Sequence, residues 1–424
     1  MEKLGVKEKF KSLAVPEKKI KAGFSLLTKY RSAVMGLAAI WIFVFHEWNN
    51  VFKMEIPFYI ASRIKQFGYG GVDIFLFLSG IGLTYAIGKT KLPGFYYRRI
   101  KRLILPFLSI AFVRAYLENW PWDGLIDNIT GRGFYTISIY CFLWFVPAIM
   151  TFYLFFPIYW KLFKKIGPFV FTASALIIWT IYSFKVKDTQ RADLFGFTNR
   201  MPVFMIGILV GWLAQKKKDM PFKRKYYLPM VLLFALGLFF LEATNFNGYY
   251  LLVPTSNCCI PTLCVAVTLP FLLAKGLNEL ECHKGTCIIG KILNKILIFF
   301  GGISLEFYCL QEWFANTVVP KMREREWSDS KINFVLFFST VAIAFAASIV
   351  FKYFWKLVEL PFTRRKNKKT VPVKEPAFVM NETAIEVSET GADYLNSVAE
   401  RMEIAAERIE AAANKLTESK TDIS

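Results

Sequence analysis

The chain has 424 residues, of which 55% are hydrophobic and 17% aromatic, and its mean hydropathy is +0.37. Soluble proteins are about 45–50% apolar, and the apolar residues here gather in blocks of sixteen or more. Because a hydrocarbon core about 30 Å thick needs about 20 apolar residues per helical span, the sequence predicts an all-α, polytopic membrane helix bundle. The composition excludes a soluble enzyme, a nucleic-acid-binding domain and a secreted disulfide scaffold.

The net charge of +21 is unevenly distributed along the chain. The tail from Thr370 to Ser424 has 5 Lys and Arg residues against 11 Asp and Glu, so the remainder carries +27. This positive charge is concentrated in the loops between apolar blocks, as the positive-inside rule requires. We therefore attribute it to membrane topology and expect membrane lipid, and no nucleic acid, as a partner.

The apolar blocks predict ten transmembrane helices. In chain order they cover residues 32–52, 68–88, 103–119, 141–160, 166–184, 200–215, 226–243, 256–274, 296–318 and 332–357. With the N-terminus inside, the inner segments hold 33 Lys and Arg residues and the outer loops hold 12. We therefore expect a multi-pass protein of the plasma membrane with both termini in the cytoplasm.

The sequence predicts four parts: a basic cytoplasmic segment 1–30, a membrane domain 31–365, a polar linker 366–393 and a cytoplasmic helix 394–420. In the last part, apolar residues from Leu395 to Leu416 recur at alternating spacings of three and four. This spacing is typical of a short coiled coil, which would join protomers into a homo-oligomer through residues 395–416. A lone amphipathic helix fits the pattern equally well.

The seven cysteines fit no disulfide framework. Cys282, His283 and Cys287 share a loop that we place in the cytoplasm, but three ligands without a fourth make a poor zinc site. We expect reduced thiols, no bound metal and no permanently bound cofactor.

Two ionisable residues lie at similar depth in adjacent predicted spans, where such groups are costly and usually functional. His46 lies fifteen residues beyond Arg31, or about 22 Å along a helix, and therefore in the outer half of the first span. Asp73 opens the inward-running second span near the outer surface. A carboxylate beside an imidazole fixes its tautomer and makes it a usable general base. We predict that His46 and Asp73 form a catalytic pair; a histidine that only bonds across helices is the alternative.

Other polar side chains in the spans reach the same layer and are expected to support the site. They are Ser79 of the second span, Arg114 and Glu118 of the third, Trp144 of the fourth, and Ser304, Tyr308, Gln311 and Glu312 on one stripe of the ninth. Trp144 also suits an interfacial anchor, and Arg114 with Glu118 also suits a structural ion pair.

An arginine-rich segment, FYYRRIKRLILP, enters the third span from the inner side. It places Arg98, Arg99, Lys101 and Arg102 within five residues, more than the positive-inside rule alone explains. Arginine binds phosphate bidentately and stacks on planar bases. The segment therefore predicts a phosphate and nucleotide site, with lipid headgroups as the competing ligand.

These segments resemble acyltransferase family 3, the bacterial integral-membrane O-acyltransferases, over roughly residues 30–365. MGLAAIWIFVFHEW is similar to the family's first helix, whose required histidine falls on His46. GGVDIFLFLSG is similar to the second-helix signature and includes Asp73 and Ser79. The R-x-x-R element of the arginine-rich segment falls on Arg99 and Arg102.

The chain departs from the family pattern at two positions. Met35 stands eleven residues before the histidine, where the family usually has Arg or Lys, and Arg31 or Arg114 is the candidate to supply that charge. Gln311 stands where many members have His.

The resemblance implies that the protein moves an acyl group, typically acetyl, from cytoplasmic acyl-CoA to a hydroxyl acceptor, often on a surface glycan. Acetyl-CoA is then a co-substrate whose phosphates contact Arg98, Arg99 and Arg102, and His46 is the base. Tyr308, Gln311 or Trp144 would stabilise the oxyanion. The alternatives are a transporter or flippase of a sugar-containing lipid or small solute, and a non-catalytic membrane scaffold.

Overall fold

The computed structural model describes residues 15–20, 24–47, 55–133, 135, 143–186, 195–216, 224–248 and 260–367. Within these ranges every regular element is a helix, which agrees with the predicted all-α class. The predicted cytoplasmic helix 394–420 lies outside the described residues, as does all but the start of the linker. The chain divides into two units, Met1–Phe351 and Lys352–Ser424, and the packing of the site involves the first alone.

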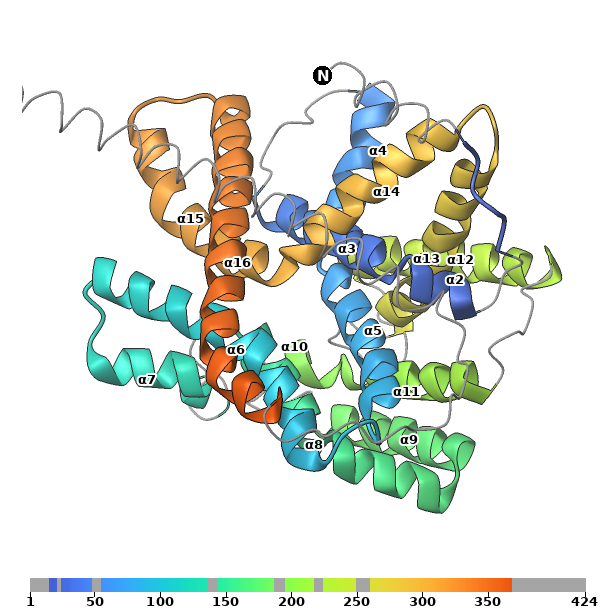
Figure 1. Cartoon of the computed structure of the whole chain (residues 1–424). Coiled ribbons are helices and arrows are strands. Elements are labelled where there is room, and N and C mark those ends of the chain that lie inside the picture. The colour runs from blue at the N-terminus through green and yellow to red at the C-terminus, as the bar shows by residue number, and fades with distance from the viewer. Residues whose placement is uncertain are drawn as a thin grey trace, which may run out of the picture. The chain divides into compact units, whose positions relative to one another are not determined.

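Each predicted apolar block contains residues of a described helix (Figure 1). The described helices are α2 (Phe24–Lys29), α3 (Arg31–Glu47), α4 (Glu55–Gln66), α5 (Gly70–Ala86), α6 (Leu92–Leu117), α7 (Trp122–Thr130), α8 (Phe145–Ile166), α9 (Pro168–Val186), α10 (Phe195–Thr198), α11 (Met201–Lys216), α12 (Arg224–Asn247), α13 (Ile260–Cys282), α14 (Cys287–Gly302), α15 (Ser304–Glu324) and α16 (Asp329–Asn367). Four shorter helices, α2, α4, α7 and α10, lie outside the blocks.

Several of these helices have the length and composition of membrane spans. Within the described residues, five are long and apolar enough to cross a bilayer: α8, α9, α12, α13 and α16. The count rises to seven if the bent pairs α4–α5 and α14–α15 are each one span, and α3 and α11 are apolar but shorter. These helices support a multi-pass membrane protein, and the ten crossings stay a prediction.

The predicted ninth span is not one straight helix, because α14 and α15 meet at a 70° bend. Ile303 separates them and follows the pair Gly301–Gly302. Glycine weakens a helix, and the hydroxyl of Ser304 donates to the carbonyl of Gly301 at 3.1 Å, a local bond that competes with helix continuation. The single helix predicted over 296–318 is therefore wrong, and α15 starts in a new direction.

Two glycines bring α3 and α14 into very close contact. A Cβ atom on Gly36 of α3 would lie 1.9 Å from the carbonyl oxygen of Leu297, and one on Gly301 would lie 2.0 Å from that of Ser32. Only glycine allows backbones to approach this closely. The crossing therefore fixes the position of α3 along α14.

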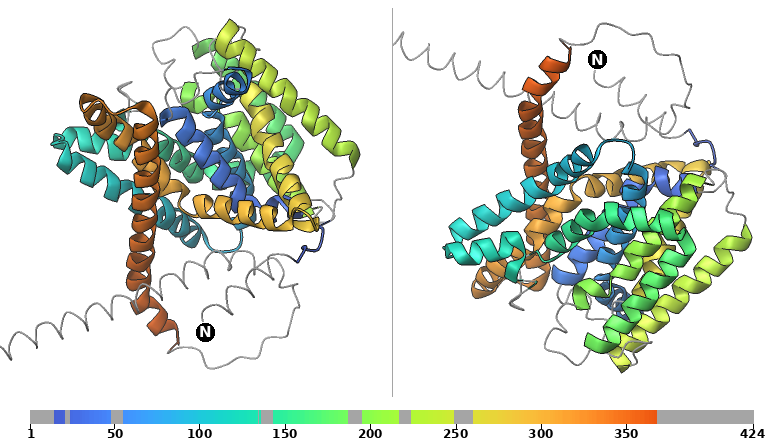
Figure 2. Two further views of the ribbon diagram at one scale, coloured as in Figure 1. Left: turned by 90° about the horizontal axis from the view of Figure 1, so that it is seen from above. Right: turned by 90° about the horizontal axis from the view of Figure 1, so that it is seen from below.

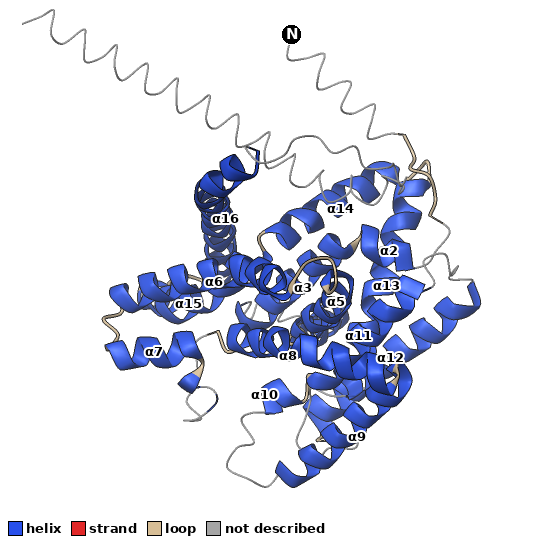
Figure 3. Cartoon of the chain, turned by 60° about the horizontal axis from the view of Figure 1, so that its bottom comes forward, coloured by secondary structure: helices blue, strands red, loops and turns tan. Residues whose placement is uncertain are grey.

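Helix α5 packs against α3 on one side and α11 on another (Figure 3). A Cβ on Gly71 would lie 2.7 Å from the carbonyl oxygen of Ala38 in α3, and one on Gly80 would lie 2.6 Å from that of Phe204 in α11. The rotation of α5 about its axis is therefore determined by two glycine contacts on different faces.

A buried carboxylate holds the start of α3. Glu281 of α13 is 1% exposed and accepts hydrogen bonds from the Tyr30 hydroxyl at 2.7 Å and the Asn294 amide at 2.7 Å. Its cationic partner is Lys29, with 3.1 Å between the ammonium nitrogen and the carboxylate oxygen. These bonds tie α13 and α14 to the chain just before Arg31.

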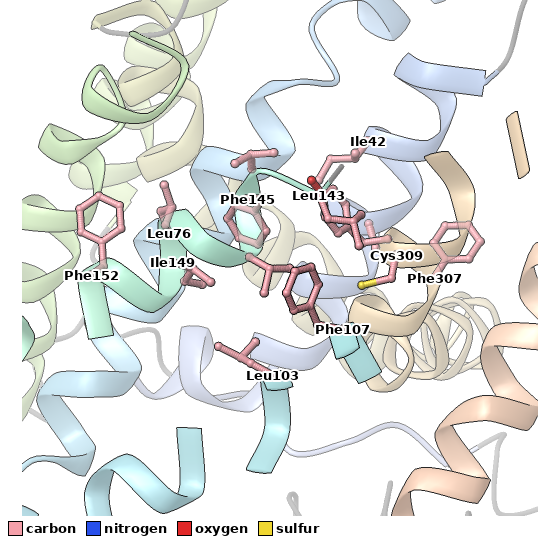
Figure 4. Close-up of a cluster of buried hydrophobic side chains, with 14 of the residues drawn as sticks. Ile42, Leu76, Leu103, Phe107, Leu143, Phe145, Ile149, Phe152, Phe307 and Cys309 are labelled. Carbon is pink, nitrogen blue, oxygen red and sulfur yellow. The ribbon is translucent and has the colours of Figure 1, made fainter. Parts of the chain in front are cut away.

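An apolar cluster joins α3, α5, α6, α8 and α15 (Figure 4). Ile42, Leu76, Phe107, Phe145 and Phe307 are among its buried members. The helices that carry the candidate site residues are thus packed on one another in a common core.

Candidate active site

A cavity of about 200 Å³ is lined by four arginines, and we call it the arginine cavity. Arg31 comes from the start of α3, and Arg98, Arg99 and Arg102 come from α6. None of the described residues that line it is acidic. Several guanidinium groups around one space form a site for an anion, above all a phosphate.

The helical spacing of α6 explains why its arginines reach the cavity. Positions 98, 99 and 102 lie on one face of a helix, and Lys101 is not among the lining residues. The guanidinium of Arg98 donates to the Thr90 hydroxyl at 2.6 Å, and that of Arg99 lies 5.0 Å from the centre of the Phe95 ring. The three arginines predicted to bind acyl-CoA are therefore brought together.

The rest of the lining combines hydroxyl groups with an apolar wall. Ser79, Tyr153, Ser304 and Tyr308 contribute hydroxyls, and that of Tyr153 donates to Ser79 at 3.3 Å. The apolar residues include four that Figure 4 shows converging from α3, α6 and α8: Ile42, Leu103, Phe145 and Ile149. Such a site accepts a ligand with a charged end and an apolar arm.

Arg31 is the residue that brings positive charge to this cavity from the first helix. It lies one turn before Met35, which also lines the cavity. Its terminal nitrogen donates to the carbonyl of Leu78 at 3.5 Å, and its Nε has no hydrogen-bond partner within the part of the chain that the structure describes. Sequence alone left Arg31 and Arg114 as equal candidates for the charge missing at Met35. Arg31 lies at the cavity and Arg114 does not.

His46 lines a second, open cavity of about 550 Å³, which we call the His46 cavity. The last three turns of α15 and the first turn of α16 form its other walls. Its polar members besides the histidine are Asn316, Arg323, Glu324, Asp329 and Asn333. The imidazole packs edge-on against the ring of Phe45, with 4.9 Å between ring centres, and is exposed.

The two cavities share α3 and α15. Ile42 of the arginine cavity lies one turn before His46, a rise of about 6 Å along the helix. On α15, Tyr308 lines the first cavity and Ala315 the second. Gln311 lies between them in sequence, is 1% exposed, and its carboxamide oxygen has no hydrogen-bond partner among the described residues.

Asp73 does not pair with His46. Its carboxylate is fully buried and lies 3.4 Å from the guanidinium Nε of Arg200 in an ion pair. Gly71 is the residue of α5 that faces α3, and Asp73, two residues later, points about 200° away around the helix. The predicted His46–Asp73 pair is therefore wrong. Two residues at the same depth in the membrane can still point to different sides of their helices.

The partner of Asp73 is a residue that the sequence did not single out. Arg200 is the first residue of the predicted span 200–215 and stands just before α11, yet it is 4% exposed. Its guanidinium lies 5.2 Å from the centre of the Trp144 ring at the start of α8. The only signal in the sequence was that a buried acid inside a span requires a cation.

This ion pair gives a test by double substitution. Arg200→Gln leaves the buried carboxylate of Asp73 without its cation, so we expect a lower midpoint of thermal unfolding in detergent. Asp73→Asn together with Arg200→Gln removes both charges and should recover part of the loss. Additive losses in the double variant would contradict the coupling.

Arg114 lines neither of the two cavities. Its Nε donates to the Glu118 carboxylate at 3.0 Å, and the same carboxylate accepts from the Trp120 indole at 2.9 Å and the Thr317 hydroxyl at 2.8 Å. This cluster connects the end of α6, which lies beside α7 (Figure 2), to α15. The geometry agrees with the alternative of a structural ion pair.

The sequence matches the family model of an acyltransferase domain over residues 33–353, which is most of the chain. No curated protein and no solved structure matches it. The matched range contains every lining residue of both cavities except Arg31. The chain therefore belongs to acyltransferase family 3 and is a multi-pass membrane acyltransferase.

Proposed function

We propose that the protein moves an acetyl group from cytoplasmic acetyl-CoA to a hydroxyl of a cell-surface or lipid-linked glycan. The observation that carries this proposal is the pair of cavities on α3 and α15. One is lined by four arginines and no acid among the described residues, and the other contains the histidine that the family motif marks. A donor site for an anion and a base for a hydroxyl thus lie along the same two helices.

The donor is bound through its phosphates. Arg98, Arg99 and Arg102 contact the phosphates of CoA in bidentate fashion, and Arg31 adds a fourth cation from α3. The apolar wall that includes Ile42 and Phe145 accommodates the pantetheine arm. Because Ile42 is one turn before His46, an arm that passes it brings the thioester toward the imidazole.

The chemical step is a nucleophilic substitution at the thioester carbonyl. His46 accepts the proton of the acceptor hydroxyl as its oxygen attacks. The carbon–oxygen bond forms, the carbon–sulfur bond breaks, and the imidazolium returns the proton to the departing thiolate of CoA. The Gln311 amide and the Tyr308 hydroxyl are the candidate donors to the oxyanion. The ion pair of Asp73 serves to hold α5 against α11.

A matched pair of α6 variants tests the donor site. Arg99→Ala removes a cavity arginine, and we expect the affinity for CoA to fall about 10- to 100-fold because hydrogen bonds to charged groups are lost. Lys101→Ala removes a positive charge from the same segment outside the cavity lining and should change the affinity little. Isothermal titration of CoA into the detergent-solubilised protein measures both. Equal affinities of the two variants would refute the role of Arg99.

The overall reaction is tested in cells with and without the protein. Mass spectrometry of envelope glycans should show a loss of acetyl groups in cells that lack it, and restoration by the wild-type chain. Unchanged acetylation of envelope glycans would refute the glycan acceptor.

A further inference from the structure

We infer that the His46 cavity is the acceptor site and that it selects a neutral, hydroxyl-rich molecule, with Asn316 as a specificity-determining residue. This inference rests on the proposed function, because it names where the attacking hydroxyl binds and what kind of molecule carries it.

The chemistry of the lining differs from that of the arginine cavity. Among the described residues, the His46 cavity contains two carboxamides, Asn316 and Asn333, and two carboxylates, Glu324 and Asp329, with a single guanidinium from Arg323. Carboxamides donate and accept hydrogen bonds, and carboxylates accept them. Sugar hydroxyls do both, so they match this set. With more carboxylates than guanidinium groups, the lining disfavours a phosphorylated or acidic acceptor.

The remaining lining and the size fit the same class of ligand. Val319, Pro320 and Ile332 give an apolar patch beside the polar groups, which suits the C–H face of a sugar ring. The volume of about 550 Å³ lies within the range of small-molecule sites, about 300–1,000 Å³. A simple long-chain alcohol would leave most of the polar groups unpaired, at a cost in affinity.

Helix geometry directs these residues to one space. On α15 the lining positions 316, 319, 320 and 323 recur every three or four residues, and on α16 so do 329, 332 and 333. Each set therefore lies along one helix face. His46, at the end of α3, completes the wall, so a hydroxyl of a molecule in this cavity can lie against the imidazole.

The test uses the full chain in nanodiscs with radiolabelled acetyl-CoA and two acceptor probes. One probe is the envelope glycan fraction, including lipid-linked glycans, from cells lacking the protein; the other is decanol. We expect label in the glycan fraction and little in decanol. Asn316→Leu should raise the half-saturating glycan concentration about three- to tenfold, as loss of one or two hydrogen bonds predicts, with CoA affinity unchanged.

A control variant lies on the same helix. Lys321 is exposed on α15 but does not line the cavity, and Lys321→Ala should leave the half-saturating concentration unchanged. Labelling of decanol at the rate of glycan, or an Asn316→Leu variant with wild-type saturation, would overturn the acceptor assignment.

A binding measurement separates this inference from the proposed reaction. Asn316→Cys places a thiol in the cavity, and the glycan fraction should slow its reaction with a membrane-impermeant maleimide. Asp123→Cys places a thiol on exposed α7, outside the cavity lining, and should not be protected. Protection without acetyl transfer would refute the reaction alone. An absence of protection would refute the acceptor site.

Discussion

Replacement of His46 by alanine is expected to abolish acetyl transfer while leaving CoA binding intact. A positioned general base contributes about 100- to 10,000-fold to a rate, and His46 is the residue of this cavity to which we assign that role. The affinity for CoA should stay at the wild-type value, because the arginines that line the other cavity are unchanged. The measurement is acetyl transfer to the envelope glycan fraction, paired with titration of CoA.

The chain supplies its own control for this substitution, since it has two histidines. His283 lies in the turn between α13 and α14 and lines neither of the two cavities. His283→Ala should transfer acetyl at the wild-type rate. Full activity in His46→Ala, in protein that elutes as wild type on size exclusion, would refute the role of His46 as the general base.

The parts of the site that follow from local helix geometry were predictable from the sequence. Arg98, Arg99 and Arg102 were expected to act together, and their spacing on α6 brings all three to one cavity. Ser304 and Tyr308 were expected on one stripe of the ninth span, in the layer of His46; they do share a face, but that face lines the arginine cavity instead. Within one helix, sequence spacing determines direction, so such groups can be identified without a structure.

The parts that depend on how helices are rotated against each other were not predictable. Depth placed His46 and Asp73 at one level, but the contact of Gly71 with α3 turns Asp73 toward Arg200 instead. Hydropathy placed Arg200 at the first position of an apolar block, and nothing in that placement indicated that its side chain is buried against Asp73. The bend at Ile303 could not be predicted for a similar reason. The segments on both sides of it are apolar, so hydropathy averaged along the sequence treats them as one span.

The close crossing of α3 and α14 makes Gly301→Ala a strongly destabilising change. Its Cβ would lie 2.0 Å from the carbonyl oxygen of Ser32, a backbone atom that cannot rotate away. The helices must separate, and α3 then moves relative to both cavities that it lines. We expect little folded protein after extraction in detergent, measured by size exclusion, and loss of both CoA binding and acetyl transfer.

Gly302, the neighbour of Gly301, provides the control for this prediction. A Cβ on Gly302 would meet no atom within 4 Å, and its backbone is not in the left-handed region. Gly302→Ala should therefore fold as well as the wild type, or gain the modest stability that alanine gives over glycine in a helix, about 0.5–1 kcal/mol. Equal yields of the two variants would show that α3 and α14 do not meet at Gly301. Loss of folded protein in Gly301→Ala, with Gly302→Ala folded, would show that the absence of a Cβ atom at Gly301 determines the position of α3, the helix that carries His46.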